Sequence, residues 1–201
     1  MLRQPSALDR IHAGMIVGQT STFGIESEIT QAFAKPSLLG LGFFVIHIMG
    51  RCYGVKSPDA TMLAVSFDEV GRRISKRGKH KAPFDEVAAT DIATAFTSAV
   101  YLDHRDDDTY LGMSAVRFTE IINANRLVWA PDGDEAFDDG SYVLQFDVGE
   151  RVRLVAFNRP TSLVDLASVQ EAWFAADCFY DILSQWRERF TAEWESLPKH
   201  S

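Results

Sequence analysis

The segment from Phe137 to Arg159 most constrains the fold, because it predicts a β-hairpin. Two runs rich in β-branched and aromatic residues flank the turn sequence Asp147-Val148-Gly149-Glu150. Pairing residue 146 with 152, 144 with 154 and 142 with 156 closes a three-residue loop in which Gly149 takes a positive φ. A slip that sets Leu144 opposite Arg153 would break the shared apolar face, so the pattern predicts one defined register. The face that results carries six side chains: Tyr142, Leu144, Phe146, Val152, Leu154 and Ala156.

The first half of the chain predicts further strands. Alternation over residues 22–29 indicates a half-buried strand, with Glu26 and Glu28 on its exposed side. The nearly continuous apolar run 38–49 predicts a central strand buried on both faces, followed by a short partner strand over 52–55. Residues 61–66 predict another short strand before a helix from Asp68 to about residue 77.

The second half mixes helices and strands. Apolar spacing predicts a helix over about 91–102, and residues 115–122 suit either a strand or a helical turn. Residues 126–130 also carry β-type side chains, and 169–174 predict a strand. Asp177 is a reasonable N-cap for a terminal helix with an aromatic stripe made by Phe179, Ile182, Leu183, Trp186 and Phe190. The pattern as a whole predicts an α+β fold, a largely antiparallel twisted sheet packed against helices that include this long C-terminal helix.

Bulk properties restrict the class of protein. We expect residues 1–14 to form a poorly ordered tail or a start extension, and residues 15–201 to form a single α+β domain large enough to bury a sizeable core. A net charge of −8 and a pI near 5.1 argue against nucleic acid and anionic membranes as partners and favour a basic protein. Two cysteines far apart in sequence suit reduced thiols in the cytoplasm. No signal sequence or transmembrane run is evident.

Signatures of chemistry are missing. His47 lies alone in an apolar run and is best interpreted as a hydrogen-bonded core residue, and the acidic run Asp103–Asp108 as a solvated loop. The acids of 132–139 do not match an EF-hand, because glycine at the sixth loop position and glutamate at the twelfth are absent. The sequence also lacks nucleophile-elbow, P-loop and dinucleotide-binding motifs. We therefore expect no catalytic, cofactor-binding or metal-binding residues. The basic segment Arg72–Lys81 is interpreted as a solvated helix end.

Four segments carry a resemblance to a known family. They are Met15–Gly18 with Ser21–Glu26, the run Gly42–Gly50, the hairpin runs Phe137–Asp147 and Val152–Phe157, and Phe179–Trp186. Together they resemble the immunity protein 42 family, and the resemblance spans about residues 15–196. It implies an α+β protein that is encoded beside a bacterial polymorphic toxin and neutralises that toxin by direct binding. It implies no reaction and no cofactor.

The leading hypothesis is thus an immunity protein that binds a cognate toxin through an acidic surface. A toxin of the nuclease type would offer a basic groove to such a surface. Two alternatives belong to other classes: a small metal-dependent hydrolase that uses the Asp103–Asp108 loop with His47 or His80, and an oligomeric scaffold whose aromatic terminal helix forms a subunit interface. The candidate partner contacts are loop acids: Asp106, Asp107, Asp108, Asp132, Asp134, Glu135, Asp138 and Asp139.

Overall fold

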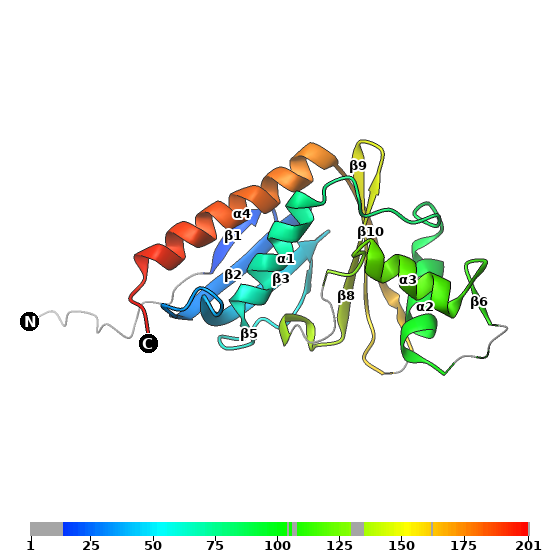
Figure 1. Cartoon of the computed structure of the whole chain (residues 1–201), viewed down its shortest axis with the longest axis horizontal. Coiled ribbons are helices and arrows are strands. Elements are labelled where there is room, and N and C mark those ends of the chain that lie inside the picture. The colour runs from blue at the N-terminus through cyan, green and yellow to red at the C-terminus, as the bar shows by residue number, and fades with distance from the viewer. Residues whose placement is uncertain (1–13, 104, 106–107, 130–134, 162, 201) are drawn as a thin grey trace, which may run out of the picture.

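The computed structural model describes residues 14–103, 105, 108–129, 135–161 and 163–200. It confirms the α+β fold: antiparallel sheets pack against helices, and a long helix closes the chain (Figure 1).

The first sheet is built from the N-terminal third of the chain. Strands β1 (Met15–Gly18), β2 (Phe23–Ala32), β3 (Gly40–Ile48) and β4 (Arg51–Tyr53) pair in that order, and β5 (Thr61–Met62) also pairs with β3. Helices α1 (Leu63–Ser75) and α4 (Ala176–Ser196) lie side by side over one face of this sheet (Figure 1).

The second sheet has the order β10 (Asp165–Ala175), β9 (Arg151–Asn158), β8 (Ser141–Val148). Helices α2 (Ala89–Tyr101) and α3 (Ala115–Ala124) cover its side away from α1 and α4 (Figure 1). A small hairpin of β6 (Thr109–Tyr110) and β7 (Met113–Ser114) precedes α3. The 3-10 helix η1 (Glu135–Phe137) packs near β3 and β5.

The second sheet is buried on both faces. Val143, Leu154 and Ala156 belong to a core shared with the first sheet, α1 and α4. Leu144 and Val155 point the other way, into a second core with α2 and α3. The sheet is thus the middle layer of the molecule.

This double burial explains why the predicted hairpin register was wrong. In the structure Val148 pairs with Arg151 and Leu144 with Val155, one residue from the predicted pairing. The loop has two residues, and Gly149 occupies its first position with φ +57°, as a type II′ turn requires. Because both faces are apolar, the alternation does not identify a single inner face, and turn geometry decides the register.

Two element boundaries also differ from prediction. The strand expected over 61–66 ends at Met62, because α1 begins at Leu63 and continues through Val70 on one buried face. Residues 115–124 form a helix, the second of the two predicted options. Helix α4 follows Ala175, so Asp177 lies in the first turn and is not the N-cap. The strand predicted over 169–174 is confirmed within the longer β10.

Gly42 in β3 provides a sharp test of the packing between β2 and β3. A Cβ atom at Gly42 would lie 1.8 Å from the Glu28 carbonyl oxygen. Because this oxygen belongs to the backbone, it can move away only if the strand itself shifts. We expect Gly42→Ala to destabilise the fold by about 1–3 kcal/mol, as overpacking does. The matched control is Gly71→Ala, whose Cβ would meet the flexible Arg187 guanidinium at 2.3 Å. Urea unfolding checks both, and an equal or larger loss for Gly71→Ala would contradict this account.

Candidate functional site

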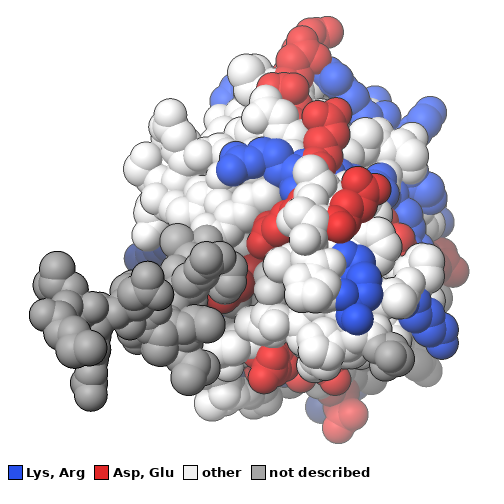
Figure 2. Space-filling model, turned by 90° about the vertical axis from the view of Figure 1, so that its left-hand side faces the viewer, with Lys and Arg blue, Asp and Glu red and all other residues white. Residues whose placement is uncertain are grey.

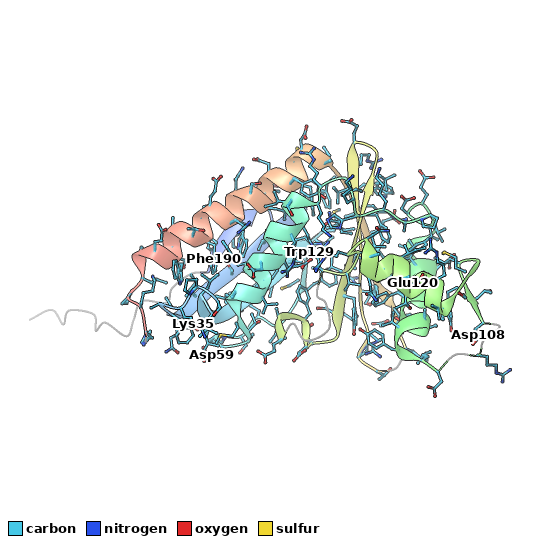
Figure 3. The ribbon with its side chains drawn as sticks, in the orientation of Figure 1. Lys35, Asp59, Asp108, Glu120, Trp129 and Phe190 are labelled. Atoms are coloured by element: carbon cyan, nitrogen blue, oxygen red, sulfur yellow. The ribbon has the colours of Figure 1, made fainter. Side chains whose placement is uncertain are left out.

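The predicted acidic contacts that the structure describes fall into two separate places. Asp108 lies near β6 beyond α2 and α3, at the end of the molecule away from the C-terminus of α4 (Figures 1 and 3). Its Oδ2 accepts a hydrogen bond from the Arg105 backbone N at 2.8 Å. Asp106 and Asp107 lie outside the described residues.

The second acidic segment borders the first sheet. Glu135, Asp138 and Asp139 are exposed, and the Asp139 carboxylate accepts hydrogen bonds from the N and Oγ of Ser141, at 3.0 and 2.5 Å. The Val55 backbone N donates to the Ala136 carbonyl at 2.7 Å and so ties this segment to the chain that follows β4. Asp132 and Asp134 lie outside the described residues. The predicted acids that the structure describes, Asp108, Glu135, Asp138 and Asp139, therefore do not converge on one site.

A groove of about 1400 Å³ runs between α2 and α3. It is lined by the C-terminal half of α2, the length of α3 and the residues that follow it as far as Val128. No local pattern in the sequence indicated it, because it forms only where two consecutive helices pack against each other. Figure 2 shows the opposite end of the molecule, where Lys and Arg side chains are interspersed with Asp and Glu on the described surface.

His47 is a hydrogen-bonded core residue, as predicted, but its partner Glu26 was expected to be exposed. Glu26 is buried, and its carboxylate lies 2.8 Å from His47 Nε2 and 2.7 Å from Lys56 Nζ. Burial alone would raise the pKa of Glu26, but hydrogen bonds from Lys56 and His47 outweigh it and lower that pKa. The exposed-face prediction failed because alternation cannot show that two basic side chains close over the carboxylate.

Among the described residues, Cys52 is the strongest candidate for a nucleophile. It pairs with His47 across β3 and β4, a contact that the sequence alone did not reveal. Burial raises the pKa of the Cys52 thiol, Glu26 and Asp139 raise it further, and Lys56 only partly opposes them. A raised pKa keeps the thiol protonated at neutral pH, and a protonated thiol is a poor nucleophile. The described residues contain no group of three or more His, Cys, Asp or Glu side chains arranged to hold a metal ion.

A buried polar network joins helices α1 and α4 to the second sheet. Asp147 on β8 accepts hydrogen bonds from Tyr180 Oη at 2.8 Å and from the backbone N of Gly78 and His80 at 2.7 and 3.2 Å. Gln145 Nε2 donates to Tyr180 Oη at 2.8 Å, and Gln145 Oε1 accepts from Arg73 at 3.0 Å. Every polar group named here is engaged by another element, so the network holds the layers in register and presents no open face for chemistry.

The basic segment 72–81 is largely part of this framework. Arg72 and Arg73 pair with Glu69, each at 3.1 Å, and Arg77 pairs with Asp177. Arg77 also lies over the Tyr180 ring, 5.2 Å from its centre. The predicted solvated helix end is thus correct only for part of the segment, since Arg73 is fully buried.

His80 makes the stability of the fold depend on pH. Its side chain is buried, with Nδ1 2.9 Å from the Asn125 carbonyl oxygen, and burial, with Arg73 nearby, lowers its pKa from 6.5. The unfolded chain therefore binds more protons than the folded one just below pH 6.5, so stability falls as pH decreases through this value. The slope reaches at most about 1.4 kcal/mol per pH unit for one proton.

We expect His80→Gln to remove this slope between about pH 6.5 and pH 5, above the range in which Glu26 titrates. Urea unfolding at a series of pH values measures it for both proteins. Two parallel stability profiles over that range would show that His80 does not cause the dependence.

Comparisons with known proteins agree with the fold. A model of the family described as immunity protein 42 matches residues 15–189, which confirms the resemblance noted in the sequence. A comparison with curated proteins gives no match. Among solved structures, the chain is similar to the crystal structure of CdiI from Burkholderia dolosa AUO158, with a TM-score of 0.53 and 15% sequence identity. The alignment covers 87% of this chain and 99% of that one, and at this identity it concerns the fold alone.

Proposed function

The chain belongs to the immunity protein 42 family, and from this premise we propose that it neutralises one cognate bacterial toxin by binding it directly, through acidic side chains on its surface. The family match carries this proposal, because it extends over both sheets and most of α4. Binding alone blocks the toxin, and no covalent bond in the toxin is made or broken. We place this action in the cytoplasm; no helix in the described part of the chain has the length and hydropathy to cross a membrane.

Charge supports a basic partner. The chain carries 28 Asp and Glu against 20 Lys and Arg, so a basic toxin surface, such as the substrate groove of a nuclease, would be attracted to it. Among the predicted contacts that the structure describes, Glu135, Asp138 and Asp139 are exposed and Asp108 is partly exposed. Asp139 is a weaker candidate, because its carboxylate is already bonded to Ser141.

The two alternative functions have less support from the geometry. The hydrolase hypothesis requires His47 or His80 to act together with the Asp103–Asp108 loop, but the His47 ring is bonded to Glu26 and the His80 ring to a backbone carbonyl. The scaffold hypothesis requires an exposed aromatic face on α4. Trp186 and Phe190 are instead fully buried, and Trp194 Nε1 donates to the Leu39 carbonyl at 2.7 Å.

Co-expression with the product of the adjacent reading frame tests the proposal. We expect cells that make this product alone to die, and cells that also make the chain to survive and to yield a co-purifying complex. The control is an unrelated acidic protein of similar size in place of the chain. If the product stays lethal and the two proteins never co-purify, the proposed function is wrong.

A further inference from the structure

The two edges of the second sheet differ in how their backbone groups are bonded. At the β8 edge, the Gln145 N donates to the Leu127 carbonyl at 2.8 Å. The Asp147 N on the same edge donates to the His80 carbonyl at 2.6 Å. At the opposite edge, β10 pairs with β9 alone among the strands that the structure describes. The fold therefore covers one edge of this sheet and leaves the other open to a further strand.

The direction of each backbone group in β10 follows from its ladder with β9. The Ala176 N donates to the Glu150 carbonyl at 2.9 Å, so these two residues form a hydrogen-bonded pair. Bonded and non-bonded pairs alternate in an antiparallel ladder, and the register is unbroken over the second half of β10. The N–H groups of Glu171, Trp173 and Ala175 therefore point away from β9. No hydrogen bond within the described part of the chain takes up any of these three groups.

This edge lacks most of the features that keep natural edge strands from pairing. Proline, lysine and bulges are the usual obstacles. Residues 165–175 contain neither proline nor lysine, and their register shift is confined to the first half of the strand. The carboxylate beyond that shift, Glu171, already accepts from Trp173 Nε1 at 2.5 Å and lies 3.1 Å from Arg153 Nε. The second half of β10 is thus a regular strand whose outer side can accept a partner.

Aromatic surface lies beside the open edge. Trp173 is half-buried, and the guanidinium groups of Arg151 and Arg153 lie 4.5 and 5.4 Å from its ring centre. Phe174, on the opposite face, is partly buried against the first core. Tryptophan and arginine are enriched among the residues that contribute most to protein interfaces. Because two cations already flank the Trp173 ring, a partner side chain at this point should be apolar and uncharged.

We propose that the toxin adds an extended segment to this edge as a fourth strand of the second sheet, with an apolar side chain over Trp173. In such pairing, main-chain hydrogen bonds give affinity and alternate side chains give specificity. A second copy of this chain is the less suitable occupant, because a net charge of −8 opposes self-association. This inference rests on the proposed function and adds the mode of contact to it.

Amide hydrogen exchange followed by NMR tests the proposal residue by residue. The probe is the protein encoded by the adjacent reading frame, separated from its complex in guanidinium and refolded. We expect the amides of Glu171, Trp173 and Ala175 to exchange roughly tenfold more slowly, or slower still, in the complex than in the free chain, because they are hydrogen-bonded only there. The amides of Ala172 and Phe174 point to β9 in both states and are the internal control.

The outcomes of this measurement are distinguishable. If the probe binds and the three outward amides exchange as fast as before, the edge proposal is wrong while the proposed function stands. A probe that the unchanged chain fails to bind would overturn both.

Substitutions at Ala175 test the same edge by affinity, measured by biolayer interferometry. Ala175 has φ −60°, which suits proline, and its N–H is unbonded, so Ala175→Pro should leave the fold intact. It should weaken binding by roughly tenfold or more, because it removes one donor and places a ring at the edge. Ala175→Ser keeps the N–H and should bind as the unchanged chain does. Val116→Arg, at an exposed residue of α3, should also bind normally.

Unchanged affinity for Ala175→Pro, with urea unfolding showing it to be folded, would contradict the edge proposal. An equal loss for Val116→Arg would contradict it as well. Analytical ultracentrifugation of the free chain checks the choice of occupant, and we expect a monomer. A dimer that Ala175→Pro dissociates would assign the edge to a second copy and overturn its assignment to the toxin.

Discussion

Replacing Glu69 by Ala is expected to lower the free energy of unfolding by about 3–5 kcal/mol, because it leaves a buried arginine without its counter-charge. Arg73 is fully buried, with Nη2 3.1 Å from Glu69 Oε1 and its guanidinium 4.5 Å from the centre of the Trp129 ring. Burial lowers the pKa of Arg73 to about 10, so this side chain stays charged at neutral pH. Glu69 Oε2 also lies 3.2 Å from Arg126 Nη1, so the substitution also removes an ion pair with the segment that follows α3.

Urea unfolding followed by circular dichroism measures this loss, and the chain provides a matched control. Glu120→Ala breaks the ion pair with Arg117, also within one turn of a helix, but both side chains are more than half exposed. The control should change stability by less than about 1 kcal/mol. The double variant Glu69→Ala with Arg73→Met should recover much of the loss, because it removes the uncompensated charge. Equal effects of Glu69→Ala and Glu120→Ala would contradict this interpretation of the network.

Local patterns in the sequence predicted the elements that bury one continuous apolar surface. The apolar run 38–49 is β3 with its turn, and the stripe that includes Phe179 and Trp186 is the buried face of α4. Such patterns are reliable because the side chains themselves repeat with the period of the element.

The hairpin shows what local sequence patterns do not predict. Its two strands and its turn were predicted, but its register was not, because a strand in the middle layer has no solvent-exposed face to orient it. The glycine at the first turn position would have been the better guide, since it favours a two-residue loop.

Burial of charge was not predictable either. Glu26, Arg73 and Asp147 look like surface residues in the sequence, and their partners lie on other elements. Only the fold brings Asp147 to Tyr180, 33 positions along the chain. The candidate site depends on the same kind of information, because a run of acids shows the charge of a loop and not which hollow lies beside it.

Trp186→Ala should destabilise the fold as strongly as Glu69→Ala, by about 3–5 kcal/mol. Here the cause is the cavity that the missing indole leaves in the core, whereas in Glu69→Ala it is an unpaired buried charge. Trp186 is fully buried, and its ring lies 5.1 Å from both Phe44 and Phe190. Its Nε1 donates to Ser27 Oγ at 3.0 Å and so connects α4 to β2. Trp186→Phe keeps most of the packing but leaves the hydroxyl without its donor, so about 1–3 kcal/mol should be lost.

Thermal and guanidinium unfolding measure both variants, and Trp173→Ala, a half-buried tryptophan on β10, is the control with the smaller expected loss. The contacts of Trp186 named above are with β2, β3 and α4 and not with the outer edge of β10. The Trp186→Ala protein that remains folded at low temperature should therefore bind the toxin with unchanged affinity, although it protects cells poorly at growth temperature. Reduced affinity of the folded variant would mean that the contact surface extends to α4, because a core cavity alone changes how much protein is folded and not what the folded protein binds.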